Sequence, residues 1–224
     1  MNQLTILARV VSAPTIKTTA SDSKLATFAV EIAAYKEDDP SWTLQVTAWG
    51  KAADDAAANI REGAYLNIVG RLRLEKERPP ELQLSEFHEV TPVDLPGVNA
   101  IALVGRAGRD PEVRYFESGS SVANLSLAVN RIRKDDGPDW FNLKVWGKQA
   151  EVAADYVRKG SPLGITGSLA EERWTDRTSG EERSKLVVRV SRLDLLGSRR
   201  DSEAAPAGGD QWSNGPASDE EIPF

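Results

Sequence analysis

The chain has 224 residues, a formal net charge of −6 and no cysteine. This length allows one large domain or two small ones, each with its own core. The lack of cysteine excludes a disulfide framework, Cys-ligated zinc and thiol catalysis, and it fits a reducing compartment. The chain has no apolar run near the roughly 20 residues that span a bilayer, and its first residues enter a strand pattern without the features of a signal peptide. We therefore expect a cytoplasmic protein.

The charge is distributed unevenly along the chain. Residues 1–97 contain 10 Lys or Arg and 14 Asp or Glu, a net charge of −4. Residues 98–200 contain 18 and 14, a net of +4, and residues 201–224 contain none and 6, a net of −6. A basic body with an acidic tail can bind a polyanion through one part and proteins through the other.

The sequence repeats itself with an offset of 97 residues, and the matches are strongest around a Trp-Gly-Lys triplet. The matched pairs include Trp49 with Trp146, Gly50 with Gly147, Lys51 with Lys148, Gly70 with Gly167 and Arg9 with Arg106. Two copies of about 100 residues are each long enough to form a small domain. The boundary is predicted near Leu95-Pro96-Gly97, where Pro and Gly interrupt the chain.

The first copy, residues 1–97, shows five strand patterns and one helix pattern. Strands are predicted near residues 3–10, 25–34, 42–49, 65–72 and 81–91, with a helix near residues 52–61. The loop between its last two strands is short, from Leu74 to Pro80.

The second copy, residues 98–200, has the same order and clearer signals. Strands are predicted at Ala100–Ala107, extended by Pro111–Phe116, then at Val122–Asn130, Trp140–Trp146, Leu163–Leu169 and Lys185–Leu196. A helix is predicted at Gln149–Lys159 with Gly160 as its C-terminal cap, and a polar loop at Ala170–Arg183. Five strands with a helix between the third and fourth is the order of the OB-fold. The predicted class is therefore all-β, with two tandem OB-fold barrels and one helix in each.

The tail, residues 201–224, is rich in Ala, Gly, Pro and Ser and is predicted to be disordered. It ends in three acids followed by an apolar tripeptide. This tip suits a small apolar pocket ringed by Lys or Arg, because Pro limits the backbone and Phe supplies an anchor. The candidate partner-binding residues are Asp219, Glu220, Glu221, Ile222, Pro223 and Phe224.

The second copy combines aromatic and basic residues in a pattern typical of single-strand binding, where bases stack on flat rings and phosphates meet cations. Trp140 and Trp146 are six residues apart on one strand and so point to the same face, while Trp174 lies in the polar loop. For Trp146 a core position is an equally good interpretation. The candidate phosphate contacts are Arg106, Arg114, Arg131, Arg133, Lys134, Lys148, Arg158, Lys159, Arg173 and Arg177.

These residues together resemble the bacterial single-stranded-DNA-binding protein family. The resemblance is carried by Asp110-Pro-Glu-Val-Arg-Tyr, Trp140 with Trp146-Gly-Lys, Tyr156-Val-Arg-Lys-Gly and Arg173-Trp-Thr-Asp, and by the acidic Ile-Pro-Phe terminus. It implies that Trp140, Trp146 and Trp174 stack bases, that Arg158 and Lys159 lie near the strand path, and that the tail tip binds replication, recombination and repair proteins. It also implies a homodimer with four OB-folds. We expect no cofactor, metal or membrane partner.

The resemblance has departures, which concern the path of the DNA. Asn142 stands where the family often has a basic residue, Glu172 precedes Arg173, and no stacking aromatic lies between Arg131 and Asp139. The first copy resembles the family mainly through its Trp-Gly-Lys triplet, so Trp49 is its candidate contact. Its Trp42 and Trp49 are seven apart and should face opposite sides. We expect the first copy to bind DNA weakly or to complete an oligomer.

Three other functions are open to such a chain. An enzyme of the nuclease type would need clustered carboxylates, a His base or an activated nucleophile, and the single histidine, His88, does not supply this. A protein adaptor of the replication-restart type would use the folds to oligomerise and would bind nucleic acid weakly. RNA binding is a third, because an OB groove does not reject RNA. We expect a sequence-independent binder of single-stranded DNA that is not an enzyme.

Overall fold

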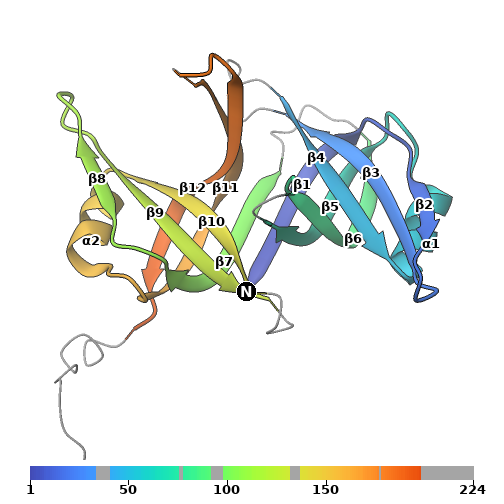
Figure 1. Ribbon diagram of the computed structural model, residues 1–224, viewed down its shortest axis with the longest axis horizontal. Coiled ribbons are helices and arrows are strands. Elements are labelled where there is room, and N and C mark those ends of the chain that lie inside the picture. The colour runs from blue at the N-terminus through green and yellow to red at the C-terminus, as the bar shows by residue number, and fades with distance from the viewer. Residues whose placement is uncertain (34–40, 76–77, 92–97, 132–136, 177, 198–224) are drawn as a thin grey trace, which may run out of the picture.

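Two barrels of similar construction lie side by side in the computed structural model (Figure 1). The structure describes residues 1–33, 41–75, 78–91, 98–131, 137–176 and 178–197. The predicted boundary at residues 95–97, the candidate contacts Arg133, Lys134 and Arg177, and the tail from residue 201 lie outside these ranges.

In the described residues each barrel has five main strands, a short extra strand after the first of them, and one helix. The first barrel contains β1 (Asn2–Val10), β2 (Thr15–Thr18), β3 (Lys24–Ile32), β4 (Trp42–Trp49), α1 (Lys51–Asn59), β5 (Tyr65–Arg73) and β6 (Glu81–Val90). The second contains β7 (Asn99–Ala107), β8 (Glu112–Tyr115), β9 (Ser121–Asn130), β10 (Pro138–Trp146), α2 (Lys148–Tyr156), β11 (Pro162–Thr175) and β12 (Glu182–Leu195). The predicted all-β class with two OB-fold barrels is confirmed.

Alternation of apolar and polar residues builds both barrels. In β3 every second side chain from Ala26 to Ile32 is buried, and β9 and β10 bury Leu125, Leu127 and Leu143 in the same way. The barrels close where β1 pairs with β3 and where β7 pairs with β9. Gly105 allows this closure, because a Cβ there would stand 2.4 Å from the carbonyl oxygen of Ala128.

The two helices follow the third main strand of each barrel through a glycine with positive φ, Gly50 at 56° and Gly147 at 59°. This backbone conformation strains other residues and lets the chain turn from strand into helix within one residue. The helices lie at opposite outer ends of the molecule (Figure 1). The prediction for α2 was too long, because the helix ends at Tyr156. Gly160 is not its cap but the φ +89° residue of the turn that follows.

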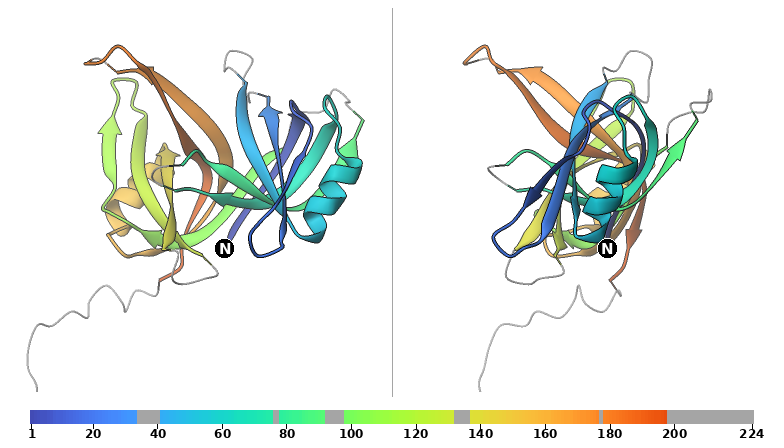
Figure 2. Two further views of the ribbon diagram at one scale, coloured as in Figure 1. Left: turned by 45° about the vertical axis from the view of Figure 1, so that its right-hand side comes forward. Right: turned by 90° about the vertical axis from the view of Figure 1, so that its right-hand side faces the viewer.

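The second barrel differs from the prediction in its last two strands. β11 and β12 have 14 residues each and stay paired from Leu163↔Leu195 to Thr175↔Glu182. The segment predicted as a polar loop, Ala170–Arg183, is therefore mostly the end of a β-hairpin. Figure 2 shows this hairpin, in orange and brown, rising well clear of the barrel.

The barrels join edge to edge through β1 and β7, which pair antiparallel and make one twelve-stranded sheet. Leu4 pairs with Ile101, its own counterpart at the repeat offset of 97, so the contact has an internal twofold axis. Asn2 and Asn99 repeat the symmetry in their side chains. Each donates its amide to a carbonyl, of Leu72 and Leu169 respectively, and accepts that residue's N–H.

A second contact between the barrels is asymmetric, and we call it the junction cluster: Arg73, Leu74 and Glu75 of the first barrel with Arg131 and Asp139 of the second. Asp139 accepts hydrogen bonds from the Leu74 N–H at 3.0 Å and from Arg131 Nη2 at 2.8 Å. Arg131 Nη1 lies 3.5 Å from Glu75. The side chains of Arg131 and Asp139 are only 8% and 2% exposed, so the cluster fixes the two barrels to one another through buried charges.

Candidate nucleic-acid interface

The outer face of β10 carries Trp140, Asn142, Lys144 and Trp146, because alternate residues of a strand share a face. The buried partners Phe141, Leu143 and Val145 point into the core. Both tryptophans are half exposed, at 50%. The two possibilities for Trp146, core or surface, are thereby decided in favour of the surface.

Each of these rings rests on a particular support. The Trp146 ring stacks on Phe116, which follows β8, with centroids 6.1 Å apart and planes inclined by 13°. The Trp140 ring lies against Gly108, where an added Cβ would come within 2.3 Å of it. Rings held in this way lose little freedom when a base stacks on their open side, which favours binding.

Trp174 reaches the solvent from the far part of β11 and is 43% exposed. It lies on the same face of β11 as Glu172, two residues before it. The ammonium of Lys185, on β12, lies 5.7 Å from the centre of the Trp174 ring, a cation–π contact. The hairpin thus presents a third flat ring with a cation beside it.

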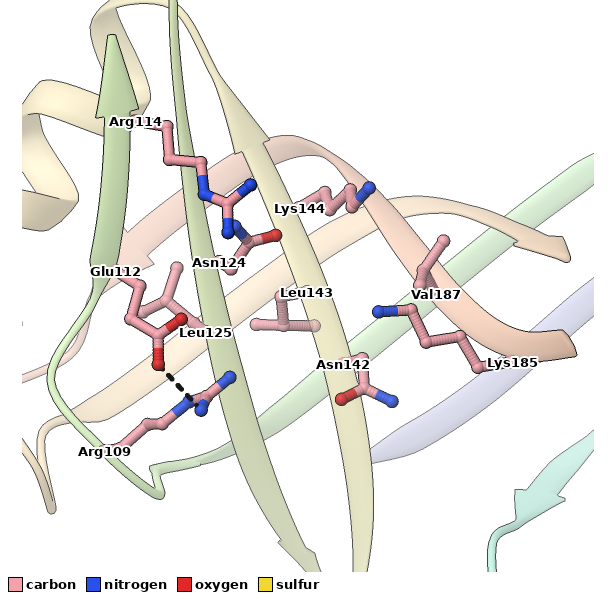
Figure 3. Close-up of a pocket in the computed structure, with 10 residues that line it drawn as sticks. All are labelled: Arg109, Glu112, Arg114, Asn124, Leu125, Asn142, Leu143, Lys144, Lys185 and Val187. Atoms are coloured by element: carbon pink, nitrogen blue, oxygen red, sulfur yellow. Dashed lines mark ion pairs between the residues drawn. The ribbon is translucent and has the colours of Figure 1, made fainter. Parts of the chain in front are cut away.

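A polar hollow of about 270 Å³ lies between β8, β9, β10 and β12 (Figure 3). Four cations and two carboxamides line it, together with Glu112, whose carboxylate pairs with Arg109 at 2.9 Å. These lining residues are Arg109, Arg114, Lys144, Lys185, Asn124 and Asn142. Because Asn142 and Lys144 stand between Trp140 and Trp146 on β10, the hollow lies between two stacking rings. We call this whole surface, from Arg114 to the hairpin, the outer face of the second barrel.

The basic residues expected from the sequence are spread over several places. Arg114 lines the hollow. Arg106 of β7 pairs with Ala128 of β9, and Trp140 of β10 pairs with the same Ala128 from its other side. Lys148 is exposed at the start of α2. Arg158 donates to the carbonyls of Ala154 and Asp155 in α2 and of Val157 just after it. Arg106 donates to the carbonyl of Gly160 at 3.0 Å. Lys159 is exposed in the turn after α2.

Arg131 and Arg173 do not lie on the outer face. Arg131 is buried in the junction cluster, where its charge is compensated by Asp139, so we remove it from the candidate interface. Arg173 lies on the opposite face of β11 from Trp174. It pairs with Glu171 at 2.6 Å and reaches the Ser41 carbonyl of the first barrel.

Several residues of the outer face were missed by the sequence analysis, among them Arg109, Lys144, Phe116 and Lys185. Lys144 could have been found, since it has even spacing to both tryptophans of its strand. Phe116 and Lys185 carry no such signal. Their positions depend on the pairing of β8 with β9 and of β11 with β12.

The corresponding face of the first barrel is poorer in rings and cations. Thr43, Gln45 and Thr47 stand where the second barrel has Trp140, Asn142 and Lys144. Trp49 is exposed, whereas Trp42 is 6% exposed and belongs to the core. The prediction that Trp42 and Trp49 face opposite sides is confirmed.

Near the junction, burial raises the pKa of Glu81, and the charge of Arg73 opposes this shift.

The described part of the chain shows no group of three or more His, Asp or Glu side chains arranged to hold a metal ion. Among the same residues, no helix is long and apolar enough to cross a membrane.

A chain of two OB-fold barrels with stacking rings and cations on one outer face defines a class of nucleic-acid-binding protein. The profile of the single-strand binding protein family matches residues 1–90 and 98–196. The chain belongs to this family, as its motifs predicted.

Similar proteins come from cyanobacteria and from Thermus. A single-stranded DNA-binding protein of Thermosynechococcus vestitus is 61% identical over 114 residues, covering 50% of this chain and 95% of that protein. Single-stranded DNA-binding protein 1 of Synechocystis sp. is 63% identical over 110 residues, covering 48% and 91%. Half of this chain therefore matches nearly the whole of each relative.

A solved structure matches almost the full chain. The wild-type single-stranded DNA binding protein from Thermus aquaticus superimposes with a TM-score of 0.68 and 21% identity, covering 93% of this chain and 97% of that one. At this identity the likeness concerns the fold, and it extends the two-barrel arrangement to a second protein.

Proposed function

We propose that this protein binds single-stranded DNA without sequence preference and is not an enzyme. The observation that carries the proposal is the outer face of the second barrel, where three exposed tryptophans accompany four cations around one hollow. Rings stack on any base, and carboxamides such as Asn124 and Asn142 both donate and accept, so the face does not select a sequence. Family membership and the names of the relatives support the same function.

The unit that binds is residues 98–200, with residues 1–97 as a weaker partner and residues 201–224 as a tail. Two observations favour this division: the net charge of +4 in the second segment against −4 in the first, and the lack of a second exposed tryptophan on β4. In the cell the protein would protect single strands during replication, recombination and repair, with the DNA in the cytoplasm.

Tryptophan fluorescence tests the function directly. Stacking of bases on Trp140, Trp146 and Trp174 should quench the emission when oligo-dT is added at low salt. Affinity should fall as salt rises, with a log–log slope of about −0.7 for each phosphate contact. A duplex of the same length is the control and should bind more weakly. Unchanged emission with oligo-dT at low salt would contradict DNA binding and leave the adaptor as the better function.

The acidic tip of the tail is the proposed site for partner proteins, on the ground of its sequence. Deleting residues 222–224 should abolish retention of replication and repair enzymes on the immobilised protein, while oligo-dT affinity stays equal or becomes slightly tighter. The full-length chain is the control. If DNA affinity collapses on deletion, the tip belongs to the fold instead.

The protein is further proposed to be a homodimer. The central strands β6, β5, β1, β7, β11 and β12 form one sheet whose inner face is buried, with Leu4 and Ile101 at its centre. Its outer face carries small side chains such as Thr5, Ala100 and Thr166. In the described part of the chain the helices pack mainly on β3, β4, β9 and β10, and α1 also touches β6 at one edge of this sheet. A broad sheet face with an internal twofold axis is suited to pair with a second copy.

A further inference from the structure

Glu172 stands among the cations of the outer face. Its Oε1 lies 2.5 Å from Nζ of Lys144, and its Oε2 lies 3.9 Å from Nζ of Lys185. The two lysines come from different strands, β10 and β12, and only this carboxylate is shared between them among the ion pairs of the described residues. The carboxylate therefore holds together two cations that would otherwise repel each other.

The position of this trio relates it to the hollow. Lys144 and Lys185 both line the hollow, whereas Glu172 approaches them from β11. In Figure 3 the two lysines reach toward the hollow from separate strands, and Arg114 reaches into it from β8. Lys185 also lies beside the exposed ring of Trp174. A nucleotide with its base on Trp174 would thus have its phosphate near Lys185 and Lys144.

We infer that Lys144 and Lys185 form a phosphate-binding site for the DNA strand, and that Glu172 occupies this site as an anionic substitute in the free protein. The inference rests on the proposed function, because the ligand is a phosphodiester of single-stranded DNA. Binding exchanges one anion for another: the carboxylate withdraws, and a phosphate oxygen takes its place between the two ammonium groups.

The exchange is feasible because the trio is partly open to water. The side chains of Glu172 and Lys144 are about one-quarter exposed, at 25% and 27%, and Lys185 is 46% exposed. Water therefore screens these charges in part, and a polyanion that brings several phosphates can compete with the carboxylate for the lysines. Glu172 then lowers the affinity for DNA without preventing binding, and it keeps the lysines in position when DNA is absent.

Substitution of Glu172 by Gln tests the site. Glu172→Gln removes the competing charge with little change of shape, so oligo-dT should bind about five- to tenfold more tightly at about 50 mM salt. The gain should shrink at about 200 mM salt, because it is electrostatic. Affinity is measured by tryptophan quenching, and thermal unfolding verifies that each variant is folded.

Glu171→Gln is the matched control. It removes the same charge one residue away, but Glu171 lies on the opposite face of β11 and pairs with Arg173. It should change the affinity by less than twofold. A third variant, Lys144→Gln, should weaken binding, and Glu172→Gln added to it should give a clearly smaller gain than it gives alone.

The outcomes separate the inference from the proposed function. If wild type binds oligo-dT but the Glu171 and Glu172 variants gain equally, only net charge matters and the phosphate site is wrong. If Glu172→Gln weakens binding, the carboxylate positions the lysines and is no substitute for phosphate. If neither wild type nor any variant binds oligo-dT, the proposed function fails, and the phosphate site fails with it.

Discussion

The tryptophans of β4 and β10 show how one position along a strand separates a core residue from a surface residue. Trp140 and Trp42 both lie near the start of their strands, β10 and β4. At the repeat offset of 97, however, Trp42 corresponds to Asp139, the residue before Trp140. In a strand that difference reverses the face. Trp42 is therefore buried, whereas Trp140 lies open to solvent against Gly108.

Replacement of Trp174 by Ala should therefore weaken oligo-dT binding strongly. A stacked base is worth about 1–3 kcal/mol, which corresponds to roughly 5- to 150-fold in affinity. Trp49→Ala is the control, since Trp49 is equally exposed but its strand lacks a second surface ring and a lysine. Titration with oligo-dT measures both. A larger loss for Trp49 would mean that the first barrel is the main site.

Trp42 is unsuited to that comparison. Its ring is part of the hydrophobic core of the first barrel, so Trp42→Ala would cost about 3–5 kcal/mol of folding stability. Any loss of DNA binding would then report unfolding.

At the scale of elements, the sequence predicted strands well where one face is buried and poorly where neither is. The central part of β11 alternates cleanly and ends its buried run at Leu169. Beyond it, Glu171, Glu172 and Arg173 are polar on both faces, so the period of two disappears. The hairpin persists because β11 and β12 pair with each other, and that pairing has no signature within either strand.

The hairpin is also the element that distinguishes the two barrels. β5 and β6 have 9 and 10 residues, against 14 in β11 and β12. The longer pair brings Glu172, Trp174 and Lys185 to the outer face. Among its described residues the first barrel has no matching extension, which agrees with its lower content of surface rings.

At the scale of the whole molecule, the two barrels form one continuous sheet, and the junction cluster joins them a second time. Removing one partner of a buried pair such as Arg131 and Asp139 leaves an uncompensated charge, which is strongly destabilising. Arg131 is thus fixed by Asp139 of its own barrel, and it reaches Glu75 of the first barrel at 3.5 Å. The sequence around a charged residue does not indicate whether its side chain meets a phosphate or a distant carboxylate, such as that of Glu75, 56 residues before Arg131.

The assembly should contain two chains. Sedimentation equilibrium should give twice the chain mass of 24.4 kDa, because the sheet face around Thr5 and Ala100 is broad and has an internal twofold axis. Thr5→Glu with Ala100→Glu should give monomers, since like charges would face each other across a twofold axis. Glu substituted at Thr15, an exposed position on β2, is the control. A monomeric wild-type chain at micromolar concentration would exclude the dimer.

The amino-acid sequence alone determined the two tandem OB-folds, the shared face of Trp140 and Trp146, and the family, because repeats, alternation and short motifs are read directly from the sequence; that this face is the surface came from the structure. Only the tertiary structure decided that Arg131 is buried, that Phe116 supports Trp146, and that Glu172 holds Lys144 and Lys185. Each of these depends on which strands pair and in which register. Register is set by contacts between distant segments, so side chains far apart in the chain meet in ways that no local pattern records.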